Sequence, residues 1–379
     1  MNISLGKIST PLRALVSTAL LKRSNNRTFT TISPLSPTHE KDPLHEGDNF
    51  LKVPDRGILQ IHGDDTVKFL QGIITNHMPH IATGGDGFFT AFLAPNGRVL
   101  YDAFIYPKNQ GLNFSSPVFL IECSSASTKD LLKHIKKYIL RSRVKIQDVS
   151  EEYNVWNLWG PKANFIETGK PVNIPQGSMI LKEIGDIRCK DTRYPGLGNR
   201  IILPSDKVLS LPADFNELNS REYTIRRILH GVPEGPDFFT NTSLPLESNF
   251  DYMNGIDFRK GCYVGQELTI RTYHTGVTRK RILPVQITSD AEVISSTPTQ
   301  IKVDRSVELD LPPPAQDIIV DGTKNARNNA KFCGGIHNIG LALVRLELLQ
   351  KPDIKLRTEG SNGNPLNVHP VIPDWWPKN

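Results

Sequence analysis

The sequence predicts an α+β fold divided into two or three domains. At 379 residues the chain is longer than one ordinary compact domain. Strand patterns and helix patterns are mixed along it without a regular repeat, which favours an α+β arrangement over a helical bundle or a repeat array. Hydrophobic residues make up 38% and charged residues 22% of the chain, a globular composition rather than a disordered or membrane-spanning one.

Residues 1–40 have the composition of a mitochondrial transit peptide with a disordered lead. They are rich in Ser and Thr, and five Lys or Arg residues precede the first acid, Glu40. The apolar run 12–21 is too short to span a bilayer, and Arg13 interrupts it, which argues against a secretory signal. We expect cleavage just after Phe29 and residence in the mitochondrial matrix. An uncleaved native tail is the alternative.

The charge balance argues against a nucleic-acid partner. The chain carries 45 Lys and Arg against 39 Asp and Glu, a formal net charge of +6. Removing the five cations of the leader from the 45 leaves 40 cations against 39 anions. No cationic surface for nucleic acid is therefore expected in the rest of the chain. No apolar run is long enough for a transmembrane segment.

Residues 48–150 are predicted to form the first α+β unit. After Asp65, which can cap a helix, apolar residues recur at helical spacing over 67–74. Two apolar runs within 88–106 flank a Pro-Asn-Gly turn and predict a hairpin. Residues 128–144 form an amphipathic helix whose Lys and Arg face is expected to be solvated. Residues 151–220, which begin with strand and turn signals, are predicted as a second α+β unit.

A small C-terminal β-barrel is predicted for residues 278–379. Strand patterns at 279–287 and 340–349 enclose a polar stretch at about 288–332. This stretch has too few apolar residues to fold well alone, so we interpret it as an insertion in the barrel. The tandem tryptophans 375 and 376 are expected to clamp the tail onto the barrel rather than to bind a ligand.

The four cysteines predict neither a disulfide framework nor a zinc site. They stand at positions 123, 189, 262 and 333, with no CxxC pair and no His/Cys spacing suited to zinc. Cys123 lies in an apolar run and is expected to be a small core residue. Cys189 and Cys333 have no neighbours that indicate chemistry. Cys262, in RKGCYVGQEL, is the exception.

The neighbours of Cys262 favour a reactive thiolate. Arg259 and Lys260 precede it, and a helix that opens just after it would add the partial positive charge of its N-terminus. Three interpretations remain open. The cysteine fills a hole in a packed turn, or it is a nucleophile with His274 as base, or it is one ligand of an iron-sulfur cluster. Because a cluster needs several ligands, typically thiolates, such a cluster would have to be shared with a partner protein.

Several blocks of the sequence resemble one protein family. KGCYVGQEL (260–268) and the following TIRTYHTGVTRKRILP are similar to the hallmark of YgfZ-type iron-sulfur cluster assembly factors, a branch of the folate-binding, aminomethyltransferase-like (GcvT-like) superfamily. Further blocks resemble the family in family order: RGILQIHGDDTVKFLQGIITN (56–76), FFTAFLAPNGRVLYDAFIY (88–106), YILRSRVKIQDV (138–149), DTRYPGLGNR (191–200), RRILHGVPEG (226–235), LPLESNFDYMNGIDFRKG (244–261) and IGLALVRLE (339–347). Together they cover most of the chain from about residue 50 onward.

The resemblance implies a three-domain arrangement around a central opening. Residues 221–277 would return to pack on the first unit. It also implies a mitochondrial factor that supports [4Fe-4S] cluster maturation with A-type scaffold proteins, for client enzymes such as lipoate synthase and aconitase-like proteins. Cys262 would lend one thiolate to a shared cluster, and Lys260 and Gln266 of the same motif would shape the thiolate and the turn.

The family also suggests a tetrahydrofolate site. Asp102 matches the acidic residue that aminomethyltransferases use near folate, and Arg227 matches an arginine of the central opening. The alternatives are an edge-strand carboxylate facing water for Asp102, and an ion pair with Glu234 or Glu247 for Arg227. Where relatives often read Thr-Asn-Asp, this chain reads Thr-Asn-His at 75–77, which removes one acidic contact.

Two classes of function therefore compete. The first is a non-catalytic assembly factor that lends Cys262 to a cluster. The second is a folate-dependent one-carbon transferase that uses Asp102. A transferase has no evident need for Cys262, so the sequence favours the first. A folate-binding scaffold without chemistry is a third option, and it predicts that replacing Cys262 is silent in cells.

Overall fold

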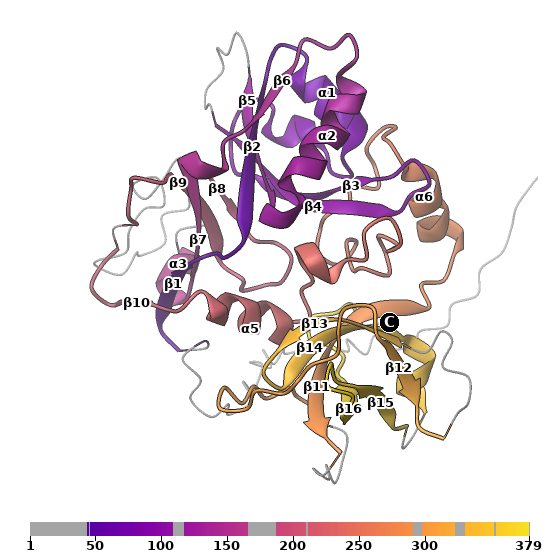
Figure 1. Ribbon diagram of the computed structural model, residues 1–379. Coiled ribbons are helices and arrows are strands. Elements are labelled where there is room, and N and C mark those ends of the chain that lie inside the picture. The colour runs from indigo at the N-terminus through magenta and orange to yellow at the C-terminus, as the bar shows by residue number, and fades with distance from the viewer. Residues whose placement is uncertain are drawn as a thin grey trace, which may run out of the picture. The chain divides into compact units, whose positions relative to one another are not determined.

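The computed structural model describes residues 44, 46–108, 117–165, 187–209, 211–290, 298–322, 330–351 and 354–378 (Figure 1). The predicted leader and parts of the predicted polar insertion lie outside these residues. Within the described residues, no helix is long and apolar enough to cross a membrane. The strands of the described residues form two five-stranded sheets and a closed six-stranded barrel. The α+β prediction, including the C-terminal barrel, is therefore confirmed.

The first sheet has the strand order β3-β4-β5-β2-β6, with every neighbouring pair antiparallel. Its strands are β2 (Arg56–His62), β3 (Phe88–Leu93), β4 (Val99–Pro107), β5 (Val118–Ser124) and β6 (Lys145–Asp148). β3 and β4 form the predicted hairpin, and Gly97 in its turn has a φ of +80°. Side chains on alternate strand positions enter two different cores, so both faces of the sheet are buried.

Two helices cover one face of this sheet. They are α1 (Thr66–Ile73) and α2 (Thr128–Ile139), and they bury Leu70 and Leu131 at the positions that the helical spacing predicts. The predicted cap is wrong, because the Asp65 side chain makes no capping bond to α1. It accepts hydrogen bonds from Arg143 instead, at 2.7 Å from the backbone nitrogen.

The second sheet has the order β10-β1-β7-β9-β8. Its strands are β1 (Asp48–Lys52), β7 (Tyr153–Trp159), β8 (Ile187–Lys190), β9 (Asn199–Pro204) and β10 (Phe215–Glu217). β1 falls in the range expected for the first unit, yet it pairs with β7 and β10 of the second sheet. A five-residue strand carries no local signal for the sheet it joins, because its partners lie more than a hundred residues away.

The barrel closes in the order β11-β14-β13-β12-β15-β16. Its strands are β11 (Lys280–Ser289), β12 (Asp317–Val320), β13 (Ala330–Ile336), β14 (Ile339–Arg345), β15 (Leu356–Glu359) and β16 (Pro365–Pro370). β12 lies within the stretch expected as a polar insertion, so that stretch supplies a barrel strand. Trp376 packs on the barrel core as predicted. Trp375 instead donates a hydrogen bond to the carbonyl of His230, at 2.9 Å.

Two helices of the return segment connect these parts. α5 (Arg221–Leu229) packs against β13 and β14 of the barrel, and α6 (Gln266–Thr275) lies beside the turn between β3 and β4 (Figure 1). A single core contains buried residues from both sheets, α5 and the barrel, for example Phe104, Ile202, Ile228 and Leu341. Segments far apart in sequence thus share one apolar interior.

Candidate functional site

Cys262 is the only exposed cysteine of the four, all of which lie in the described residues. It stands in the turn that leads into α6, four positions before the helix begins. The other three thiols are buried, and burial raises the pKa of Cys123 to about 12 and raises the pKa values of Cys189 and Cys333 as well. A partner protein can therefore reach one sulfur without unfolding the chain.

Lys260 fixes this turn to the end of α1. Its Nζ donates hydrogen bonds to three carbonyl oxygens, those of Gln71 at 2.8 Å, Ile74 at 2.6 Å and Asn76 at 2.9 Å. These carbonyls belong to the last turn of α1 and to the residues just after it, where backbone acceptors lack helical partners. Burial lowers the pKa of Lys260 to about 7, but three acceptors require the three N–H groups of the ammonium. Among the described contacts, Lys260 makes none with Cys262, so its role is to hold the turn.

The rest of the motif closes the turn itself. The backbone N–H of Val264 donates to the carbonyl of Gly72 at 2.9 Å, and the N–H of Tyr263 donates to Oε1 of Gln266 at 3.3 Å. Gly265 has a φ of +79°, and a Cβ on it would lie 2.4 Å from the carbonyl oxygen of Ala94. Only glycine fits this position without a backbone shift. The side chain of Gln266 thus accepts a hydrogen bond from within the turn that precedes its own helix.

Among the described residues, no hydrogen bond or ion pair joins Cys262 to a second ligand or to a base. The side chain of Arg259 is 92% exposed. His274, the base considered from the sequence, is exposed and meets Tyr273 edge-on, with no contact to Cys262 among the described residues. In the described part of the chain, no three His, Cys, Asp or Glu side chains are grouped so that they could hold a metal ion. The described part of the chain therefore exposes one thiol at this turn and has no group of three or more such side chains to hold a metal ion by itself.

Asp102 lies in a different place, inside the first sheet. Its residue is 2% exposed, and β4 is an interior strand, so the interpretation as an edge-strand carboxylate facing water is wrong. Oδ1 accepts a hydrogen bond from the N–H of Gly235 at 3.0 Å, whereas Oδ2 has no partner. Burial raises the pKa of Asp102, although Arg56 nearby lowers it.

A buried network of ion pairs, which the sequence did not predict, lies next to Asp102. It joins Arg56, Arg193 and Arg200 to Glu122, Asp191 and Glu234, with Tyr106 and Tyr223 attached. Arg56 illustrates the geometry, because its Nε lies 2.6 Å from Glu122 and its Nη1 lies 3.0 Å from Glu234. Three guanidinium groups face three carboxylates, so the formal charges cancel.

The arginines keep the buried acids ionised. Burial alone would raise the pKa of Glu234, but Arg56, Arg193 and Arg200 hold it well below its usual range. Glu122 has the same balance, with its pKa lowered by Arg200 and Arg56 against the effect of burial. The side chains of the network come from both sheets, from α5 and from the loop before η4 (Gly235–Asp237). The network therefore ties these elements together.

Arg227 lies close to this network but pairs differently from the prediction. Its Nη1 donates to Oδ2 of Asp237 and, at 3.3 Å, to the carbonyl of Val232. Neither expected partner, Glu234 or Glu247, accepts a hydrogen bond from it among the described contacts. The same carboxylate oxygen of Asp237 also accepts a hydrogen bond from the backbone N–H of Glu234, at 2.9 Å, within the cap of η4.

The first two residues of the Thr-Asn-His segment at 75–77 have a structural role. The third, His77, is the one that departs from the family pattern, and its Nδ1 lies 3.1 Å from Nε2 of Gln71. Oγ1 of Thr75 donates to the carbonyl of Gly255 at 2.6 Å, and Nδ2 of Asn76 donates to the carbonyl of Asn254 at 3.0 Å. These bonds attach the return segment to the first sheet. Cys262 is exposed and Asp102 is buried, so the cysteine turn and the Asp102 network are two separate sites.

Two known domain families match the chain. Residues 50–168 match the family described as "GCVT N-terminal domain", and residues 279–378 match "CAF17, C-terminal beta-barrel domain". The second range contains all six barrel strands. A solved structure, the glycine cleavage system aminomethyltransferase T from Bartonella henselae, aligns with a TM-score of 0.56 over 86% of each chain at 12% identity. At that identity the likeness shows the fold alone.

Curated relatives are much more similar. The "Iron-sulfur cluster assembly factor IBA57 homolog, mitochondrial" of Neosartorya fischeri is 40% identical over 366 residues, which cover 90% of this chain and 80% of the relative. The homologues of Aspergillus oryzae and Mycosarcoma maydis, which carry the same description, are 40% and 36% identical over 367 residues each. The chain belongs to the family of IBA57-type mitochondrial iron-sulfur cluster assembly factors.

IBA57 family membership confirms the resemblance carried by the KGCYVGQEL motif. In this IBA57-type chain the motif forms a rigid, exposed turn with the sulfur on the outside. The aminomethyltransferase-like fold brings Asp102 and Arg227 near one short loop, η4, but most polar groups there are already paired within the chain. The family and the geometry therefore direct attention to Cys262.

Proposed function

We propose that the chain supports [4Fe-4S] cluster maturation in the mitochondrial matrix by lending the Cys262 thiolate to a cluster that it shares with an A-type scaffold protein. The supporting observation is that one exposed cysteine stands on a fixed turn, in a chain whose described residues contain no group of three or more His, Cys, Asp or Glu side chains that could hold a metal ion alone. Client enzymes would be [4Fe-4S] proteins such as lipoate synthase and aconitase-like proteins. The chain would act as a non-catalytic factor.

Fixing the turn favours this role. A shared cluster requires the sulfur to stay at one position while a second protein binds, and disorder of the turn would oppose binding. Lys260, Gln266 and the backbone of Val264 hold the turn on α1 and on the start of α6. Cys262 itself takes part in none of these bonds, so its sulfur is left for the cluster.

The test is anaerobic reconstitution of the chain from residue 30 with its A-type scaffold, followed by visible absorption and complex size. We expect a coloured heteromeric complex with the native chain and none with Cys262→Ser. Cys189→Ala, which removes a buried thiol, is the matched control and should keep the colour. A coloured complex with Cys262→Ser would disprove cluster ligation by this residue. For the leader, an intact Met1 in the mature protein would contradict the transit peptide.

A second candidate function, tetrahydrofolate-dependent one-carbon transfer, is favoured by one observation. Oδ2 of Asp102 and Nη2 of Arg56 are both buried without a hydrogen-bond partner, so they suit the polar edge of a bound pterin. Calorimetric titration with tetrahydrofolate tests it. Binding that Asp102→Asn abolishes would support this function, and an absence of heat with the native chain would exclude it.

A further inference from the structure

α6 is unusually exposed for a short helix. Only Thr269 among its ten residues is buried. A helix on a globular domain normally buries an apolar stripe, and an isolated helix shorter than about 12 residues is marginal in water. Most of the side chains of α6 therefore form open surface.

Contacts at the start of α6 explain how it stays in place. A Cβ on Gly97 of the β3–β4 turn would lie 2.8 Å from Cβ of Leu268, so the turn and the first helical turn touch closely. Further along, the rings of Phe258 and Tyr273 stack with centroids 3.7 Å apart at an interplanar angle of 13°. These contacts hold α6 in place, although most of its side chains remain exposed or only partly buried.

The exposed side chains of α6 and of the residues just after it are of the types found in protein interfaces. Tyr273 is 49% exposed and Val277 is 78% exposed, two of the five large hydrophobic residues exposed in the described part of the chain. Arg271 and Arg279, each two positions along the chain from one of these residues, are also exposed. Tyr and Arg are enriched at the centres of interfaces, where they contribute most of the binding energy.

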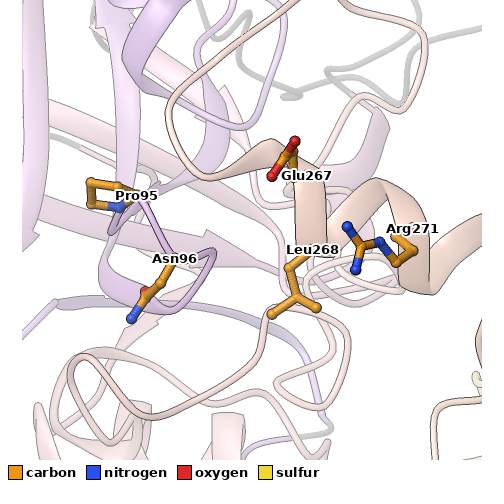
Figure 2. A pocket seen from close by; sticks show the side chains of 5 residues that line it. All are labelled: Pro95, Asn96, Glu267, Leu268 and Arg271. Carbon is orange, nitrogen blue, oxygen red and sulfur yellow. The ribbon is translucent and has the colours of Figure 1, made fainter.

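A groove continues this surface toward the hairpin. Pro95 and Asn96 of the β3–β4 turn face Leu268 of α6 across it, with Glu267 and Arg271 on the helix side (Figure 2). Its volume of about 200 Å³ is below the roughly 300–1,000 Å³ typical of small-molecule pockets. It therefore suits one side chain of a docked protein better than a cofactor.

Sharing a cluster forces a partner onto this part of the molecule. A standard interface buries about 800 Å² on each partner, which corresponds to a disc of roughly 16 Å radius. α6 begins four positions after Cys262, and its ten residues span about 15 Å. A protein bound through the sulfur of Cys262 therefore covers α6 if its interface extends from Cys262 toward that helix.

We infer that one surface of the chain docks the protein that supplies the remaining cluster ligands. This α6 surface consists of the exposed side chains of α6, the exposed residues that follow it as far as Arg279, and the groove at Pro95 and Asn96. The inference rests on the proposed function. On this surface Arg271 and Arg279 carry two positive charges, and Glu267 carries one negative charge. The docked protein accordingly presents an acidic patch, which speeds association and makes it sensitive to salt.

The test measures binding of the A-type scaffold to the chain by biolayer interferometry at low and high salt, without a cluster and after reconstitution. The charge-reversed variant R271E/R279E should bind about tenfold or more weakly and lose most of its salt dependence. The milder R271Q/R279Q should fall between it and the native chain. K207E/K355E makes the same charge change at exposed sites just after β9 and just before β15. It is the control and should bind as the native chain does.

The outcomes separate this inference from the proposed function. If the native chain forms the coloured complex and R271E/R279E binds the scaffold equally well, the docking surface is wrong and the cluster role stands. If the native chain binds no scaffold at all, the proposed function fails and the surface fails with it. If charge reversal changes only self-association, seen by light scattering, the α6 surface binds a second copy and the inference is overturned.

Discussion

Nζ of Lys260 lies 2.6 Å from the carbonyl oxygen of Ile74, 186 positions earlier in the chain. The side chain next to the exposed cysteine turn thus ends on the last turn of α1. In the KGCYVGQEL motif, which resembles a site for thiolate chemistry, Lys260 thus joins the cysteine turn to the end of α1. The position of the sulfur depends on α1 as much as on its own neighbours.

Replacing Lys260 by Met should therefore destabilise the chain and loosen the turn. The variant keeps the apolar stem but leaves three half-buried carbonyls without a donor, which costs about 2–4 kcal/mol in free energy of unfolding. Urea unfolding measures this change, and the rate of Cys262 alkylation reports the mobility of the turn. Lys260→Arg should not restore stability, because a planar guanidinium cannot point at three carbonyls around one atom. Equal stability of Lys260→Met and the native chain would contradict the anchoring role.

Gly265 and Gly261 flank Cys262 and should respond differently to alanine. Gly265 has a φ of +79° and would place a Cβ 2.4 Å from the carbonyl oxygen of Ala94. Gly265→Ala should cost about 1–3 kcal/mol and displace the start of α6. A Cβ on Gly261 meets no atom within 4 Å, so Gly261→Ala should change stability by less than about 0.5 kcal/mol. Chemical unfolding of both variants checks this, and similar losses in the two would refute it.

The buried carboxylate Glu234 should give a pH-dependent contribution to stability. Its pKa in the folded chain lies well below the usual value, so its stabilising effect is complete above the unfolded pKa, about 4.3, and is lost as pH falls through the folded pKa. Glu234→Gln leaves two arginines incompletely paired and should cost about 3–5 kcal/mol at pH 7. The difference between variant and native chain should shrink below about pH 4.3.

Unfolding curves at several pH values between 3 and 7 test this dependence. Glu347→Gln is the control, since its carboxylate pairs with Arg345 at 3.2 Å on the surface with 62% of its side chain exposed. That change should stay within about 0.5 kcal/mol at every pH. A constant gap between Glu234→Gln and the native chain from pH 3 to pH 7 would show that the network does not depend on this ionisation.

Local patterns predicted the parts of the fold that depend on neighbouring residues. The α1 and α2 helices and the β3–β4 hairpin follow from spacing and turn chemistry over fewer than twenty residues each. The motif around Cys262 identified the exposed thiol and the family. The predicted helix start after the motif was also right, because Gly265 permits the positive φ that begins α6.

The long-range features could not be predicted in this way. Arg56 and Glu234 lie 178 positions apart, and each is of a residue type that is normally exposed, so nothing local indicates their buried pair. The same holds for Lys260, whose charge suggested an effect on the thiolate rather than hydrogen bonds to α1. The place of β1 in the second sheet likewise depends on partners that no local pattern specifies.

That placement of β1 affects the order in which the chain can fold as it is synthesised. The ribosome releases β1 first, but β7 and β10 follow only after the whole first sheet has been made. The apolar residues Phe50 and Leu51 must wait unpaired through that interval, and strands waiting in this way are prone to aggregation. A chaperone that holds the nascent N-terminal segment would therefore raise the yield of folded chain more than one acting on the barrel.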